Sequence, residues 1–208
     1  MQDRTKKIRR PGRPRKFDER ETLAKMQRRL WTTGLSGISI EGIARAAGLN
    51  RPSLAAAFGD RDAIYAQAAA QYGAMMDQRM REALADQDLE TALQKAFEAA
   101  IGVYTDDGPN GCFITSTAPA ETLTSPVVRA ILDRTVHDID ALFLQRLEKE
   151  TGERAADLAL LAEQLGATLH SLSLRARAGW TSDRLQSLAA ATIHSVLGSL
   201  RDSESAQL

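Results

Sequence analysis

The stretch that decides the fold runs from residue 39 to residue 58 and reads SIEGIARAAGLNRPSLAAAF. Its first half has apolar residues at helical spacing, which predicts one buried stripe on a short helix: Ile40, Ile43, Ala44 and Ala47. Ser39 is a favourable N-cap, and Gly48 ends this helix because glycine adopts the left-handed backbone region without a Cβ clash. A second helix follows, with Asn50 as its cap and Pro52 in its first turn. Two short helices joined by a glycine turn are typical of the helix-turn-helix motif of DNA-reading proteins.

The segment from Phe17 to Tyr65 resembles the DNA-binding domain of the TetR family of bacterial transcriptional regulators. The residues that carry the resemblance are Leu30, Trp31, Gly34, Ser39, Ile40, Ile43, Ala44, Ala47, Gly48, Leu54, Phe58 and the following GDRDAIY. One position departs from the family, which usually has Tyr where this chain has Ala55, so a common phosphate-contacting hydroxyl is absent. The resemblance implies an all-α protein of about nine helices, with a three-helix reading domain followed by a helical bundle.

The composition also favours an all-helical protein. The chain has 208 residues, of which 43% are hydrophobic and 5% aromatic, so it can bury a sizeable core. The single Cys112 excludes an internal disulfide framework and fits a reducing compartment. Neither an apolar run of about 18 residues nor an apolar segment behind the N-terminal charges is present. We therefore expect a cytoplasmic protein without a membrane span or a signal peptide.

Residues 1–16 form a basic arm that holds eight of the 27 Lys and Arg but one of the 27 Asp and Glu. Such a block repels itself in isolation and gains order on a polyanion by counterion release. Part of it resembles the Gly-Arg-Pro core of an AT-hook, a minor-groove reader: Gly12, Arg13, Pro14, Arg15 and Lys16. We expect Arg13 and Arg15 to follow the groove, and the alternative is a solvated tail that only aids solubility.

The rest of the chain predicts a DNA-binding domain at 17–65, a helical effector-binding and dimerisation domain at 66–201, and a frayed tail at 202–208. Asp18 and Glu21 form an acidic capping box, so the first helix is expected to start near residue 18. A helix running from the Gly59–Arg61 turn to about Ala85 should join the two domains. Further helices are predicted at 89–104, 127–150, 153–178 and 182–200, with a short Thr-rich stretch at 112–123.

The candidate base-reading residues lie in the first part of the second motif helix: Arg51, Ser53, Ala55 and Ala56. Pro52 in the same turn is a further candidate DNA contact. Arg51 is the main candidate, because a bidentate Arg–guanine contact contributes about 1–3 kcal/mol of discrimination. Ser39, Arg45 and Arg61 are better suited to phosphate, which fixes register without reading sequence. The resemblance supports Arg61, since the family usually has a phosphate-contacting Lys there. A solvated surface arginine is the alternative for Arg45.

A ligand cavity is expected among the middle helices. The candidate lining residues combine apolar bodies with a few polar tips: Met75, Phe97, Tyr104, Phe113, Thr117, Leu123, His137 and Phe143. Plain core packing is the alternative for each. His137 shares a helix face with Asp133, but two ligands do not make a metal site, so we expect no metal and no other cofactor. Cys112 is expected to be a small buried residue, with redox sensing as the alternative.

The last two predicted helices carry long apolar stripes. The first stripe comprises Leu158, Leu161, Leu165, Leu169 and Leu172, and the second Leu185, Leu188, Ile193, Val196, Leu197 and Leu200. The resemblance implies that these helices form a four-helix interface between two subunits. An internal core is the alternative, because a stripe does not show whose helix it meets.

These features predict a homodimeric repressor that binds a double-stranded DNA operator and is released by a small-molecule effector of unknown identity. The alternative is a DNA-binding protein without such a ligand, either architectural or controlled by a partner. An enzyme is not expected, because three histidines, one cysteine and no phosphate loop leave no recognisable nucleophile and base. No membrane partner is expected.

Overall fold

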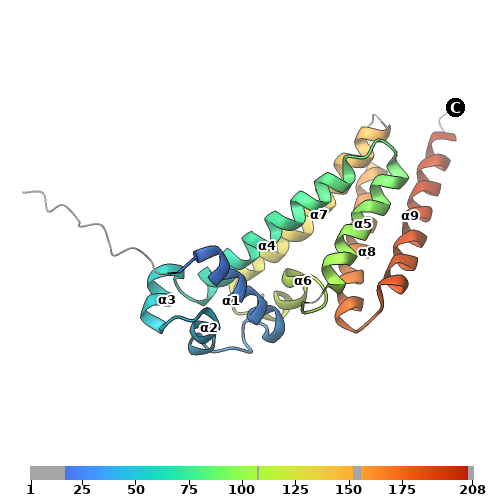
Figure 1. Ribbon diagram of the computed structural model, residues 1–208. Coiled ribbons are helices and arrows are strands. Elements are labelled where there is room, and N and C mark those ends of the chain that lie inside the picture. The colour runs from blue at the N-terminus through green and yellow to red at the C-terminus, as the bar shows by residue number, and fades with distance from the viewer. Residues whose placement is uncertain (1–16, 107, 152–155, 206–208) are drawn as a thin grey trace, which may run out of the picture.

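A computed structural model describes residues 17–106, 108–151 and 156–205 (Figure 1). Its elements are α1 (Glu19–Thr33), α2 (Ile40–Ala47), α3 (Arg51–Phe58), α4 (Arg61–Leu84), α5 (Leu89–Thr105), α6 (Phe113–Thr117), the 3-10 helix η1 (Pro119–Glu121), α7 (Pro126–Thr151), α8 (Ala156–Arg177) and α9 (Ser182–Ser205). The prediction of an all-α fold with about nine helices is confirmed for these residues. Among them, no helix combines the length and apolar character that crossing a membrane requires.

The first three helices begin and end where the sequence predicts. The side chains of Asp18, Ser39 and Asn50 each accept a hydrogen bond from a backbone N–H in the first turn of α1, α2 and α3. Gly48 ends α2 in the left-handed conformation, with φ of 68°. The capping residues and this glycine therefore set the angle between α2 and α3.

Helix α4 belongs to both parts of the molecule. Its first turns pack against α1 and α3, and the helix packs against α5 and α7 along the bundle. Figure 1 shows it leaving the three-helix domain and running beside α7. The expected boundary between residues 65 and 66 falls inside this continuous helix, so a tilt of its bundle end must move its other end.

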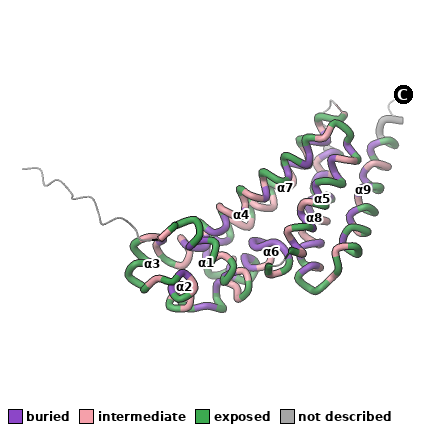
Figure 2. The backbone as a smooth tube through the Cα atoms, in the orientation of Figure 1, coloured by how far each residue is buried: buried purple, intermediate pink, exposed green. Residues whose placement is uncertain are grey.

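Helices α5, α7, α8 and α9 complete the bundle with α4. Figure 2 shows their inner faces as buried and their outer faces as exposed. The rings of Phe97 and Phe143 stack in this core with centroids 5.8 Å apart. The short α6 and η1 lie between the bundle and α1. Helix α9 continues to Ser205, so the backbone is helical over residues 202–205, where a frayed tail was expected.

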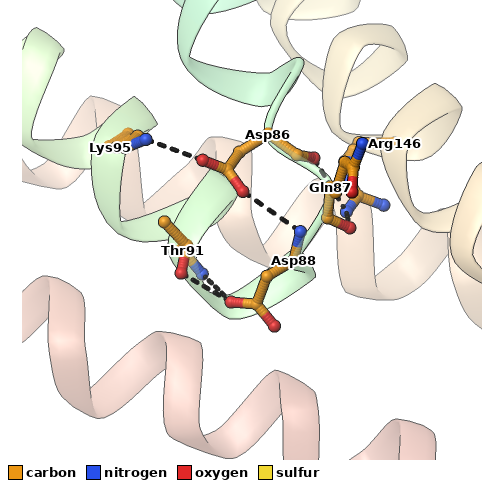
Figure 3. A network of polar contacts seen from close by, with 6 residues as sticks. All are labelled: Asp86, Gln87, Asp88, Thr91, Lys95 and Arg146. Carbon is orange, nitrogen blue, oxygen red and sulfur yellow. Dashed lines mark hydrogen bonds and ion pairs between the residues drawn. The ribbon is translucent and has the colours of Figure 1, made fainter.

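A polar network fixes the turn between α4 and α5 (Figure 3). Arg146 on α7 is 4% exposed, and its guanidinium donates to the carbonyl oxygen of Gln87 at 3.1 Å and to Glu150 at 2.8 Å. Asp86 accepts from Lys95 at 2.6 Å. Burial of Arg146 is tolerated because these acceptors replace its hydration. The network therefore stabilises the end of the bundle distant from α3.

Candidate DNA-reading surface and effector cavity

Helix α3 buries one edge and leaves the rest of its surface open. Leu54 and Phe58 are buried against the other helices of the small domain. The candidate DNA contacts on this helix are all exposed: Arg51, Pro52, Ser53, Ala55 and Ala56. The structure thus brings them together on one accessible helix, as a role in the major groove requires.

Arg51 is paired with a residue that the sequence analysis missed. Its guanidinium lies 3.0 Å from the carboxylate of Glu41 on α2. The side chains of Arg51 and Glu41 are 68% and 55% exposed, so water screens the pair and its contribution to stability is small. A base or phosphate that binds Arg51 must compete with Glu41. The sequence shows that Glu41 is an acidic residue in the first turn of α2. It does not show that Glu41 pairs with Arg51, because that depends on the angle between α2 and α3.

The three candidate phosphate contacts have different surroundings. Arg45 is exposed on α2. The hydroxyl of Ser39 caps α2 by accepting from the N–H of Gly42 at 3.1 Å. Arg61 is half-buried and donates to the carbonyl oxygen of Leu35 in the α1–α2 connection. Their role at phosphate remains a prediction. The arm candidates lie outside the described residues: Gly12, Arg13, Pro14, Arg15 and Lys16.

A largely apolar cavity of about 470 Å³ lies among α4, α5, α6, α7 and α8. Its apolar lining includes Ala69, Met76, Ile114, Ile131, Ile139, Leu142 and Leu169. The charged lining residues are Asp77, Arg134 and Asp138, of which Arg134 and Asp138 are exposed. Asp77 pairs with Arg81 at 2.8 Å. The charges therefore lie towards solvent, and most of the wall is hydrocarbon.

Most of the predicted cavity residues do not line this cavity. Of the eight, Tyr104 does. Met75 borders a separate pocket beside α1, and the buried residues elsewhere in the core are Phe97, Phe113, Thr117 and Phe143. Leu123 is 87% exposed, and the side chain of His137 is 77% exposed. The prediction was wrong because helical spacing identifies a buried face but not which buried residues border a void.

Tyr72 on α4 and His170 on α8 are among the polar cavity residues that the sequence analysis missed. Burial raises the pKa of Tyr72 well above its usual value, and charge on Cys112 and Tyr104 would raise it further. Burial lowers the pKa of His170. The Tyr72 hydroxyl contacts the Cys112 side chain and the Phe113 backbone, and His170 Nε2 makes no hydrogen bond with the described residues. A tyrosine and a histidine among apolar helix positions were the available signal, since each needs a polar partner when buried.

Metal binding at His137 gains no support. His137 lies on the surface, where the backbone carbonyl and the charge of Asp133 raise the pKa of its imidazole. Within the described ranges, no group of three or more His, Cys, Asp or Glu is placed to hold a metal ion. Cys112 is buried, as expected, and lines the cavity.

Polar contacts join the small domain to the elements that surround the cavity. The carboxylate of Glu121 accepts from the backbone N–H and the hydroxyl of Ser36 at 2.8 and 2.6 Å. Arg177 on α8 donates to the carbonyl oxygen of Trp31 at 2.9 Å. Ser125 donates to Asp62 on α4 at 2.7 Å. The DNA-reading helices are thus tied to the bundle through more than α4 alone.

The apolar stripes of α8 and α9 require a correction. Eight of the eleven expected dimer-interface residues are buried inside the single chain: Leu158, Leu165, Leu169, Leu172, Leu185, Ile193, Val196 and Leu200. Leu161, Leu188 and Leu197 are partly buried against the same core. Side chains already buried in one chain have little surface left for a second chain, so the internal core accounts for these eight. A dimer contact at Leu161, Leu188 and Leu197 stays a prediction.

No protein-family model matches the chain. The HTH-type transcriptional repressor ComR of Escherichia coli (strain K12) is 27% identical over 194 residues, which cover 88% of this chain and 90% of ComR. A cysteine mutant of the TetR family transcriptional regulator CifR, solved with 26bp double-strand operator DNA, is 26% identical, with a TM-score of 0.81 over 88% of this chain and 98% of that chain. A transcriptional regulator from Rhodococcus sp. Rha1 is 21% identical, with a TM-score of 0.72 over 88% of this chain and 97% of that chain, and shares the fold.

Proposed function

Because this chain belongs to the TetR family of transcriptional regulators, we propose that it represses transcription as a homodimer bound to operator DNA until a small molecule enters its cavity. The observation that carries the proposal is that a capped, exposed α3 and the apolar cavity are joined by one continuous helix, α4. Relatives of the chain are regulators, and we assign it no catalytic step. We therefore propose that it acts in the cytoplasm, because operator DNA is located there.

We infer that α3 enters the major groove. Arg51 supplies the base contact with the largest discrimination, while Arg45 and Ser39 hold the phosphate backbone near α2. Arg61 contributes through the connection that it holds at Leu35 as well as through its charge. The arm of residues 1–16 adds affinity through its charges. With these roles, residues 17–65 form the DNA-binding domain and residues 66–201 form the effector-binding and dimerisation domain.

We infer that the dimer forms through the outer faces of α8 and α9. Leu160 and Leu174 on α8 are 65% and 71% exposed, and Ala167 lies between them at a spacing of seven residues. Residues seven apart fall on one helix face, so these three form an apolar strip that water covers in the single chain. Ala190 and Ala191 are exposed on α9, where small side chains permit close approach of a second helix.

Coupling between cavity and DNA needs only a small change in α4 and α6. Ala69, Tyr72 and Met76 place α4 in the cavity wall, while the first turn of α4 packs against the reading domain. A ligand that binds one orientation of α4 better shifts the protein towards that orientation. A coupling free energy of about 1–3 kcal/mol is sufficient to lower operator occupancy substantially.

A gel-shift titration with the DNA upstream of the protein's own gene tests the proposal. We expect a specific complex that survives competition by random DNA. Equal binding of upstream and random DNA would contradict sequence-specific regulation. A thermal-shift panel of metabolites tests the effector, since a ligand of the folded state raises the melting temperature. Specific DNA binding without any stabilising metabolite would favour the alternative of a partner-controlled DNA-binding protein.

A further inference from the structure

Glu41 lies beside the main base-reading candidate on the exposed surface of the motif. The Nη1 group of Arg51 donates to Oε1 of Glu41 at 3.0 Å, and both side chains are exposed. Glu41 lies in the first turn of α2, and Arg51 is the first residue of α3. Their contact therefore joins the two helices at the end of α3 whose residues contact bases in helix-turn-helix proteins.

Both helices hold the backbone of this pair firmly. Ser39 and Asn50 each cap their helix, α2 and α3, by accepting from a backbone N–H in its first turn. The short Glu41 side chain is thus anchored on a fixed helix end, whereas Arg51 alone has a long side chain with many rotamers. Holding such a side chain in one conformation costs entropy on binding, and a partner that holds it before DNA arrives reduces that cost.

The contact with Glu41 uses one nitrogen of the Arg51 guanidinium. Among the residues that the structure describes, Glu41 is the partner of this group, so Nε and Nη2 are left for another acceptor. These two donors lie on one edge of the planar group and match the O6 and N7 acceptors of guanine. Glu41 therefore competes with DNA for Nη1 alone, and a guanine can bond to the other edge while the ion pair stays intact.

The charge of Glu41 has a second effect on DNA binding. Its carboxylate is 55% exposed on the surface proposed to face DNA, so it repels the phosphates of any sequence. Repulsion weakens binding to every sequence, whereas a held Arg51 strengthens binding only where a guanine is within reach. The two effects of one carboxylate can therefore be separated by comparing DNA sequences.

We propose that Glu41 is a positioning residue, which holds the Arg51 guanidinium so that its Nε–Nη2 edge reads one guanine in each operator half-site. This inference rests on the proposed function in taking α3 as the DNA-reading helix. DNA that excludes water strengthens the pair, which is weak while both side chains are solvated. Glu41 thus raises selectivity for DNA and contributes little to folding stability.

In vitro selection from a randomised DNA library tests this role with the full-length protein. The wild type should enrich a motif, and Arg51→Ala should lose the preference for one guanine in each half-site. Glu41→Ala should weaken the preference at that same guanine and leave the other positions unchanged. Glu21→Ala is the matched control, because Glu21 is also an exposed carboxylate and pairs with Lys25 on α1 at 2.8 Å. The control should leave the whole motif unchanged.

Anisotropy titrations separate positioning from charge repulsion. Glu41→Ala should bind the selected motif about threefold to tenfold more weakly than the wild type, as the release of one long side chain predicts. The same variant should bind random DNA at least as tightly as the wild type, because a repelling carboxylate is gone. In the Arg51→Ala background, the Glu41 substitution should change the affinity for both DNAs by the same factor. Melting curves confirm that each variant is folded.

The possible outcomes distinguish the role of Glu41 from the proposed function. An enriched wild-type motif whose guanine preference Glu41→Ala retains in full, or an equal gain in affinity for both DNAs, would overturn the positioning role and leave the regulator intact. Loss of preference at a different base pair would show that Glu41 contacts a base itself, which would also overturn that role. A wild-type protein that enriches no motif would overturn the proposed function together with the positioning role.

Discussion

The carboxylate of Glu121 is 2.8 Å from the backbone nitrogen and 2.6 Å from the hydroxyl oxygen of Ser36, 85 positions away in the chain. Glu121 ends η1 and is 5% exposed, and Ser36 lies in the connection that leads into α2. Hydrogen bonds to a charged acceptor are stronger than those between neutral groups. This contact therefore holds the reading domain against η1, which directly follows α6. Ile114 of α6 borders the cavity.

Removal of the Glu121 carboxylate should destabilise the protein and loosen the reading domain. We expect Glu121→Ala to lower the free energy of unfolding by about 1–3 kcal/mol, because the Ser36 N–H then has no acceptor. A double-mutant cycle with Ser36→Ala measures the part due to the hydroxyl. Additive effects of the two substitutions in urea unfolding would show that this hydrogen bond contributes nothing.

Arg51 and Arg45 should differ in how they affect DNA binding. Arg51→Ala should weaken binding to the operator far more than to random DNA, by about 1–3 kcal/mol, because alanine cannot bond to a base edge. Arg45→Ala should weaken binding to both DNAs alike, because phosphate contacts carry no sequence information. Arg45 is the better comparison than Arg61, whose bond to Leu35 makes its removal structural as well. Anisotropy titrations that show the reverse order would refute the assignment.

Deletion of residues 1–16 tests the arm, which carries eight of the 27 Lys and Arg. Binding should weaken steeply, and the plot of log affinity against log salt should flatten by about 0.9 for each phosphate that the shortened chain no longer neutralises. The control is a chain in which Arg13 and Arg15 alone are replaced by Ala. Unchanged affinity and salt slope after the deletion would identify the arm as a passive tail.

Substitution of the exposed leucines on α8 tests the proposed dimer interface. Leu160→Glu and Leu174→Glu should convert the dimer to monomers in light scattering after gel filtration, since each buries a carboxylate against the partner. Leu123→Glu is the matched control, because Leu123 is equally apolar and 87% exposed but lies before α7. A dimer that survives both α8 substitutions would place the interface elsewhere.

Stability should fall below neutral pH partly because of His170. Burial lowers the pKa of His170 in the folded state, so between its unfolded and folded pKa values the unfolded chain binds the proton more readily. The contribution is thus constant above the unfolded pKa, near 6.5, and is lost as the pH falls towards the folded value. His170→Leu should lose less stability than the wild type between pH 7 and pH 5 in urea titrations. Identical pH dependence of the two proteins would show that folding does not lower the pKa of His170.

Local signals in the sequence predicted the fold well. Asp18, Ser39 and Asn50 act as caps because their side chains satisfy backbone groups within three residues, an interaction that needs no tertiary information. The apolar stripes of α8 and α9 predicted burial correctly but not its partner. Burial within one chain and burial between two chains leave the same periodic pattern.

The cavity was largely hidden from sequence reasoning. Tyr104 was predicted to line it, whereas Tyr72 and His170 were not, because a void arises from several helices that fail to fill a shared space. Likewise, Glu121 and Ser36 meet across 85 positions, a distance at which no spacing rule applies. Only the packing of α4, α7 and α8 shows which side chains border the space between them.

DNase footprinting of the region upstream of the protein's own gene tests the central claim most directly. A homodimer that places two copies of α3 in successive major grooves should protect two related half-sites about 34 Å apart, one helical turn of DNA. Arg51→Ala should abolish this protection at protein concentrations that give a full wild-type footprint. Protection without paired half-sites, or a wild-type footprint from Arg51→Ala, would contradict the account.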